Sequence, residues 1–245
     1  MLHPLTLIKP LIARLRSIEP WLLMMFGLVS AGGFLFLQLA SEVTEGDTRG
    51  FDEEILLSLR RANDLSVPIG PGWLTHSVDD ITSLGGTTVL TLITLVTVFY
   101  LLIIRQRRLG IFVLLGVLGG WGISTLLKLG IARPRPEIVP HLVDVHDLSF
   151  PSGHAMLSAV TYLTLGALLS RLQLRRSARI YIICIAVLLT LLIGMSRVYL
   201  GVHYPTDVLG GWCAGTVWAT LCWIVARTLV FGTESREKEE LHESR

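Results

Sequence analysis

The chain has 245 residues, of which 51% are hydrophobic and only 16% are charged, and its formal net charge is +2. The charged residues gather in a few segments, which is typical of a protein that crosses a membrane several times and excludes an ordinary soluble domain. The three cysteines lie inside apolar segments and form neither a disulfide framework nor a metal-ligand spacing, so we interpret them as small packing residues: Cys184, Cys213 and Cys222.

The first 20 residues are basic and lead into an uncharged run, Trp21–Ala40, that is long enough to span a bilayer. A cleaved signal peptide is the alternative. The run is long for one, and Gln38 stands where a small residue is expected before cleavage after Ala40. The run is therefore predicted to be a retained first transmembrane helix.

Residues 41–85 form a polar loop rich in Asp and Glu. Within it Phe51, Ile55 and Leu59 recur at helical spacing among charged neighbours, which predicts a short amphipathic helix lying on the membrane surface. Proline and glycine then interrupt the chain, at Pro68, Pro71 and Gly72.

Five further apolar runs follow: Thr87–Ile104, Leu109–Leu127, Ala155–Ser170, Ile180–Met195 and Val208–Ala226. The predicted fold is all-α and polytopic, with six transmembrane helices and the short amphipathic helix in the first extracytoplasmic loop. We expect one membrane domain over residues 21–231, a cytoplasmic N-terminal segment at 1–20 and a charged cytoplasmic tail at 232–245.

Most Lys and Arg residues lie in the N-terminal segment, in the turns at 105–108 and 171–179, and in the C-terminal tail. Alternating helices place all of these on one side, which the positive-inside rule identifies as cytoplasmic. The segments at 130–154 and 196–206 are then expected to face the periplasm or the cell exterior.

Three clusters of polar residues lie at that outer side. In the first, Lys128, Arg133 and Arg135 are cations where few are expected, which suggests that they hold an anion, although a snorkelling lysine would explain Lys128 alone. Pro134 and Pro136 stiffen the segment and stop the helix.

The second cluster is Phe150-Pro-Ser-Gly-His154, at the start of the fourth apolar run. Ser152 is either a simple helix cap or, with Gly153, part of a helix start whose free N–H groups bind an anion. His154 lies in the first turn of that helix.

The third cluster runs from Ser196 to Asp207 and contains Arg197 and His203. Asp207 is either a helix cap or the partner that fixes the tautomer of His203, four positions earlier.

Together the clusters supply what phosphoryl transfer requires. Cations and N–H groups hold the non-bridging oxygens, one imidazole attacks phosphorus, and a second protonates the leaving oxygen. No carboxylate cluster indicates a metal site.

The three clusters resemble the three-part motif of the type 2 phosphatidic acid phosphatase (PAP2) superfamily, which is related to the vanadium haloperoxidases. The family pattern is Lys-x6-Arg-Pro, then Pro-Ser-Gly-His, then Ser-Arg-x5-His-x3-Asp. It matches here at Lys128 to Pro136, at Pro151 to His154 and at Ser196 to Asp207, with every defined position present in order.

The resemblance implies roles for individual residues. His203 is the nucleophile that forms a phosphohistidine, Asp207 orients it, and His154 protonates the leaving group and then activates water. The phosphate-binding residues are Lys128, Arg135, Ser152, Gly153 and Arg197. Arg133 falls outside the motif, and a contact to a second phosphate or a headgroup is one hypothesis for it. The family is metal-independent, so no cofactor is expected.

The expected protein is an integral membrane lipid phosphatase in the bacterial cytoplasmic membrane, with phosphatidate, phosphatidylglycerol phosphate or undecaprenyl diphosphate as candidate substrates. Its partners are the lipid substrate and the bilayer, with no nucleic acid, and the oligomeric state is not predicted. Alternatives are a lipid phosphotransferase, an intramembrane serine protease using Ser152, and a non-catalytic lipid-binding or transport protein. Four residues between the first two motifs are interpreted as solvated loop residues rather than as the lining of the site entrance: His141, Asp144, His146 and Asp147.

Overall fold

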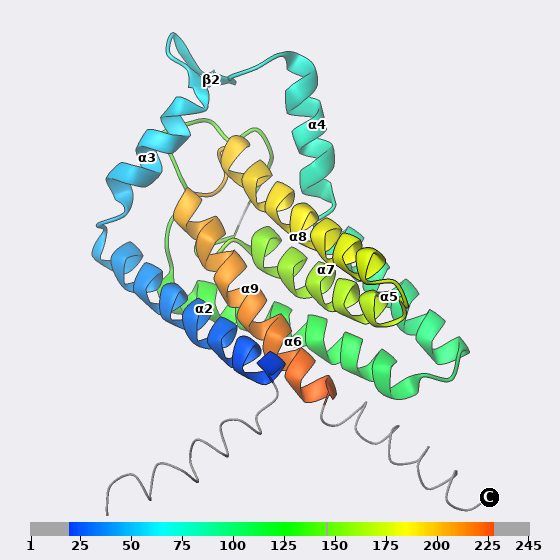
Figure 1. Cartoon of the computed structure of the whole chain (residues 1–245). Coiled ribbons are helices and arrows are strands. Elements are labelled where there is room, and N and C mark those ends of the chain that lie inside the picture. The colour runs from blue at the N-terminus through cyan, green and yellow to red at the C-terminus, as the bar shows by residue number, and fades with distance from the viewer. Residues whose placement is uncertain (1–19, 146, 228–245) are drawn as a thin grey trace, which may run out of the picture.

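The computed structural model describes residues 20–145 and 147–227, and most of this part of the chain is helical (Figure 1). The elements are α2 (Pro20–Glu45), α3 (Arg49–Ser58), β1 (Arg60–Arg61), β2 (Asp64–Pro68), α4 (Gly72–Ser83), α5 (Thr87–Ile103), α6 (Arg107–Ile131), α7 (Gly153–Arg171), α8 (Arg176–Tyr199) and α9 (Pro205–Ala226). The predicted all-α class is confirmed, with a small antiparallel β1–β2 hairpin added to it.

Five helices in this part of the chain are long and apolar enough to cross a membrane: α2, α6, α7, α8 and α9. The pair α4 and α5 passes the same test jointly, although the two helices meet at an angle of 45°. A polytopic membrane protein with five or six candidate spans is therefore confirmed. Most of these helices extend a few residues beyond the predicted apolar runs, whereas α5 ends one residue before the end of its run.

The 41–85 region is more structured than predicted. The expected short helix exists as α3, but it buries Asp52 and Leu56 completely, whereas Phe51 is 55% exposed. The exposed Phe51 is compatible with the predicted surface helix, whereas the burial of Asp52 was not predicted. The region also contains the hairpin and α4, which packs against α8.

Helix α7 is the centre of the bundle. Every residue from Ala155 to Thr161 is buried, and α7 packs against α6, α8 and α9. Helix α9 approaches it closely, because a Cβ on Gly211 would lie 2.7 Å from the carbonyl oxygen of Ser152 and one on Gly215 would lie 2.5 Å from that of Met156. These glycines let the starts of α7 and α9, which carry two of the three motifs, lie against each other.

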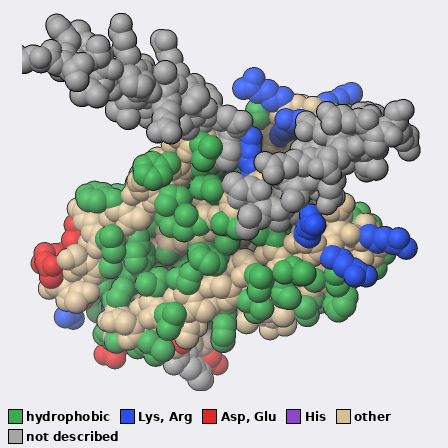
Figure 2. Space-filling model, turned by 90° about the horizontal axis from the view of Figure 1, so that it is seen from below, with side chains coloured by type: hydrophobic (Ala, Val, Ile, Leu, Met, Phe, Trp, Pro, Cys, Tyr) green, Lys and Arg blue, Asp and Glu red, His purple; other side chains and the backbone are tan. Residues whose placement is uncertain are grey.

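The surface fits a membrane protein. Figure 2 shows hydrophobic side chains spread over one face of the molecule, with most Lys and Arg toward one end and most Asp and Glu toward the other. Large apolar side chains such as Phe34, Phe99 and Leu126 are well exposed, as expected where a helix faces lipid.

Candidate active site

A cavity of about 600 Å³ opens where α6 ends and α7 begins. Its walls come from α4 to α8 and from the segments that follow α6 and α8. Six of the eight predicted site residues line it: Lys128, Arg135, Gly153, His154, Arg197 and His203. The structure thus brings together side chains from all three motifs.

His203 lies in the turn between α8 and α9 and is 1% exposed. Gly201 shapes this turn with φ +76°, and a Cβ there would come within 2.5 Å of the Arg60 guanidinium. Nε2 of His203 lies 3.2 Å from Nη1 of Arg135. A guanidinium only donates, so Nε2 must accept and the ring proton resides on Nδ1.

The Nδ1 side of the ring faces Asp207 and Ser149. It lies 3.5 Å from Oδ2 of Asp207 and 3.4 Å from Oγ of Ser149. Both distances are long for a hydrogen bond. The Ser149 hydroxyl donates to the same carboxylate oxygen, so it lies between the imidazole and the acid.

Asp207 is fully buried at the start of α9. Its Oδ2 accepts the backbone N–H of Tyr204 at 2.8 Å, which makes it a helix cap. The two sequence-based alternatives are therefore compatible, because the capping carboxylate is also the one that faces His203. Oδ1 accepts from Nη1 of Arg133 at 2.6 Å.

Arg133 does not line the cavity. Its guanidinium joins Asp207 to Asp52 of α3, with Nη2 lying 2.7 Å from Oδ2 of Asp52, and it stacks 4.1 Å from the centre of the Tyr204 ring. Asp52 also accepts from the backbone and hydroxyl of Thr206. Burial alone would lower the pKa of Arg133, but the carboxylates of Asp207 and Asp52 outweigh it and raise the pKa.

Lys128 and Arg135 converge on Asp147. Nζ of Lys128 lies 3.0 Å from Oδ2, Nη2 of Arg135 pairs with Oδ1, and Nε of Arg135 donates to the Asp147 carbonyl at 2.7 Å. Burial raises the pKa of Asp147, but the two cations outweigh it and lower the pKa to about 2. The interpretation of Asp147 as a solvated loop residue was therefore wrong. Asp144 also lines the cavity, and His146 lies outside the described residues.

Arg197 is 3% exposed in the last turn of α8. Its Nη1 donates to Oγ1 of Thr82 at 2.9 Å, while its buried Nε has no hydrogen-bond partner within residues 20–145 and 147–227. Arg197 thus brings a positive charge to the lining of the cavity, while the unpaired Nε itself is buried.

The second motif occupies the start of α7. His154 lies beside the α4–α5 bend, where a Cβ on Gly85 would come 3.4 Å from the imidazole. Ser152 takes the cap position without a capping hydrogen bond, and its buried Oγ has no partner in the described part of the chain. It does not line the cavity, whereas Gly153 beside it does.

Sequence patterns missed three residues of this site: Asp147, Ser149 and Asp52. Asp52 looked like one solvated acid among many in the 41–85 loop, and Ser149 stands one residue before the second cluster. Their contacts appear only in the folded structure, where Asp52 is buried against the start of α9 and Ser149 donates to Asp207.

Known proteins share both the sequence pattern and the fold. Residues 108–231 match the PAP2 superfamily. Phosphatidylglycerophosphatase B of Bacillus subtilis is 33% identical over 181 residues, which are 74% of this chain and 85% of that protein. An undecaprenyl-diphosphatase of Sulfolobus acidocaldarius is 29% identical over 49% of this chain and 57% of its own.

One solved structure agrees over most of its length. The crystal structure of a transmembrane PAP2 type phosphatidylglycerolphosphate phosphatase from Bacillus subtilis gives a TM-score of 0.74 at 29% identity, over 82% of this chain and 96% of its own.

Proposed function

The chain belongs to the PAP2 superfamily of membrane lipid phosphate phosphatases, and from that premise we propose that it hydrolyses its substrate through a phosphohistidine on His203. The observation that carries this proposal is the position of Nε2 of His203. It faces the cavity as an acceptor, beside Arg135 and on the same cavity wall as Lys128, Arg197 and His154.

In the first step Nε2 of His203 attacks phosphorus and the bond from phosphorus to the lipid oxygen breaks. His154 supplies the proton that the departing oxygen needs. Lys128, Arg135 and Arg197 stabilise the charge on the three non-bridging oxygens, and the helix-start N–H groups at Gly153 add to this. Asp207, with Ser149, keeps the Nδ1 proton of the imidazole in place.

In the second step water attacks the phosphohistidine. His154, left without its proton, accepts one from this water, and the bond from phosphorus to nitrogen breaks. Inorganic phosphate leaves and both histidines return to their starting states. None of these steps uses a metal ion.

The lipid is proposed to arrive sideways from the bilayer. An apolar groove of about 270 Å³ between α5 and α6 is lined by residues such as Leu90, Val117 and Leu118. It shares Thr87, Trp121 and Leu157 with the polar cavity. A lipid chain in the groove would therefore present its phosphate to the cations. Phosphatidate, phosphatidylglycerol phosphate and undecaprenyl diphosphate are the candidate substrates.

The test is phosphate release from a panel of lipid mono- and diphosphates by purified protein in detergent. His203→Ala should abolish release, and His76→Ala, which changes an exposed histidine on α4, should leave it intact. With a lipid labelled in its phosphate, an alkaline quench should trap the labelled phosphohistidine on the parent protein. The His203→Ala variant should carry no label. Turnover by His203→Ala would disprove the nucleophile assignment.

Two further measurements distinguish hydrolysis from phosphotransfer and from a metal-dependent mechanism. A phosphotransferase would move the label to a second lipid instead of to water. Chelator should leave release unchanged, and strong inhibition by EDTA would contradict the metal-free mechanism. A serine protease has no support here, because Ser152 does not line the cavity.

We also propose that the cavity faces the periplasm or cell exterior in the bacterial cytoplasmic membrane. The basic turns at 105–108 and 171–179 lie at the opposite ends of α6 and α7 from the cavity, and the positive-inside rule assigns those turns to the cytoplasm.

A further inference from the structure

The Asp147 carboxylate lies where the proposed mechanism needs a phosphate. Its two oxygens are divided between two cations, with Oδ2 on Lys128 and Oδ1 on Arg135. A phosphate with two non-bridging oxygens on the same two cations would make the same contacts. The side chain of Asp147 is 61% exposed, whereas those of Lys128 and Arg135 are only 10% exposed. The cations are therefore built into the wall, and the acid reaches them from the open side.

We propose that Asp147 is an internal anion that occupies the phosphate position in the resting enzyme, so that only a phosphate group carrying more than one negative charge displaces it. The proposal rests on the proposed function, because it takes Lys128 and Arg135 as the phosphate-binding cations. It adds a specificity-determining residue that lies outside the three motifs.

Charge explains the selectivity. Lys128, Arg135 and Arg197 bring three positive charges to the cavity, and Asp147 neutralises one of them. Because its pKa is about 2, this carboxylate is ionised at neutral pH, so a phosphate must displace it from the two cations. A dianionic terminal phosphate brings a second charge and a third oxygen, which face the positive charge of Arg197 in the cavity lining.

A phosphodiester has one charge, as the carboxylate has, and gains nothing by replacing it. Phosphodiesters are the headgroups of the bulk bilayer lipids, which surround the site at high concentration. An internal carboxylate would therefore keep the cavity free of these lipids while it admits the rarer terminal phosphates.

The matched variants are Asp147→Asn and Asp144→Asn. Asparagine keeps the shape of the side chain and removes only its charge. Asp144 also lines the cavity and is exposed, but no ion pair of its side chain is found within the described residues. Binding of inorganic phosphate and of dimethyl phosphate is measured by calorimetry on purified full-length protein, at alkaline pH where inorganic phosphate is a dianion.

Asp147→Asn should bind inorganic phosphate roughly tenfold more tightly than the parent, since the carboxylate no longer competes for Lys128 and Arg135. It should also acquire measurable affinity for dimethyl phosphate. Asp144→Asn removes a charge from the cavity wall without freeing a paired cation, so it should tighten phosphate binding much less and gain no affinity for dimethyl phosphate. Unchanged or weaker phosphate binding in Asp147→Asn would overturn the proposal, as would equal tightening in Asp144→Asn. The calorimetry measures binding without turnover. A failure of this proposal can therefore be distinguished from a failure of the mechanism, which the His203→Ala variant tests.

Discussion

At the scale of single residues, the two sides of the His203 ring face opposite kinds of charge. Nδ1 faces the acid Asp207, and Nε2 faces the cation Arg135. Burial lowers the pKa of His203 well below its ordinary value of 6.5, and Arg135 and Lys128 lower it further. The imidazole is therefore neutral at physiological pH, which is the form that a nucleophile requires.

This protonation state predicts a pH dependence. As pH falls through 6.5 an ordinary histidine gains a proton, but His203 should stay neutral because its pKa lies below that value. Histidine ring NMR signals in detergent, with the His203 signal identified by its loss in His203→Ala, should show no titration of this residue near pH 6.5. Replacing Arg135 by Gln should move its titration upward, and a midpoint near 6.5 in the parent would contradict the expectation.

Arg197 makes the second prediction at this scale. It lines the cavity with a positive charge, so we expect it to stabilise the charge on the transferring phosphoryl group. Arg197→Ala should lower kcat by about 10²–10³, the loss found when one preorganised donor to developing charge is removed. Arg61→Ala, at an exposed position in β1, is the control and should have no effect. A loss below threefold would rule out the role.

The motif residues were predictable at this scale because their types and spacing carry the chemistry. Lys128, His154 and His203 are examples, and they converge on one cavity as expected. The contacts of Asp52 and Asp147 were not predictable, since each meets partners that are distant in the sequence or reached through an irregular loop.

At the scale of elements, α3 is more than a surface helix. Its buried Asp52 accepts the first backbone N–H of α9, that of Thr206, and it pairs with Arg133, which in turn holds Asp207. The exposed Phe51 on the same helix points away from this network. Helix α3 therefore reaches the proposed catalytic carboxylate through two ion pairs.

Asp52→Asn should destabilise the protein by about 1.5–3 kcal/mol, because it leaves the buried Arg133 with one carboxylate instead of two. Asp207 should then be held less firmly, so kcat should fall while KM stays near the parent value. Thermal unfolding and steady-state rates in one detergent measure both effects. Asp80→Asn, at an exposed position on α4, is the control, and an unchanged kcat in Asp52→Asn would show that Asp52 serves stability alone.

The groove between α5 and α6 predicts a chain-length effect. Leu118→Trp should fill part of the groove and lower kcat/KM for long-chain lipid phosphates, while a short-chain phosphate ester is processed as before. Leu115→Trp adds the same ring at an exposed position on α6 that lines neither cavity. Equal losses for both substrates would place the lipid chain elsewhere.

Helix α4 shows why some elements cannot be predicted from the sequence alone. Leu74, Val78 and Ile81 recur at helical spacing, but acids and serines between them give the segment a loop-like composition. Its apolar face packs on α8, a partner that no local pattern reveals. The long apolar helices were predictable because a bilayer imposes their length.

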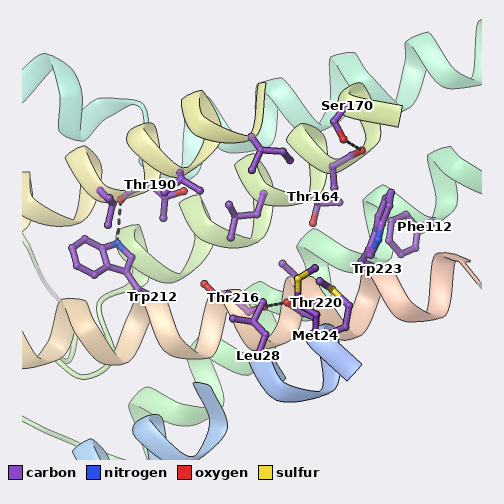
Figure 3. Close-up of a pocket in the computed structure, with 17 residues that line it drawn as sticks. Met24, Leu28, Phe112, Thr164, Ser170, Thr190, Trp212, Thr216, Thr220 and Trp223 are labelled. Carbon is purple, nitrogen blue, oxygen red and sulfur yellow. Dashed lines mark hydrogen bonds between the residues drawn. The ribbon is translucent and has the colours of Figure 1, made fainter. Parts of the chain in front are cut away.

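At the scale of the whole molecule, a large apolar cavity among the described residues is separate from the site. It measures about 550 Å³ and lies between α7, α8 and α9, with Met24 and Leu28 of α2 at its edge (Figure 3). Its labelled polar groups are mainly threonine hydroxyls, and a hydroxyl such as that of Thr190 donates to its own helix. It brings together no acid or cation and so adds nothing to the chemistry.

The orientation of the molecule can be tested by cysteine labelling. In a background without the native cysteines, Glu137→Cys should react with an impermeant maleimide in intact cells, because it is exposed in the segment after α6. Gln106→Cys, exposed in the opposite turn, should react only after the membrane is opened. The reverse pattern would place the cavity on the cytoplasmic side. Ser149 is unsuitable as a labelling position because it is fully buried.

The bend between α4 and α5 divides a candidate membrane span into two parts. On the α4 side, Thr82 accepts a hydrogen bond from Arg197 at the polar cavity, and on the other side α5 forms a wall of the apolar groove. At the bend itself, a side chain on Gly85 would collide with Ile193, 2.3 Å away. Substitutions on α5 can therefore adapt the groove to a different hydrocarbon without disturbing the arginine. Such independent variation is what one scaffold needs if its descendants are to diversify in lipid preference while they keep one chemistry.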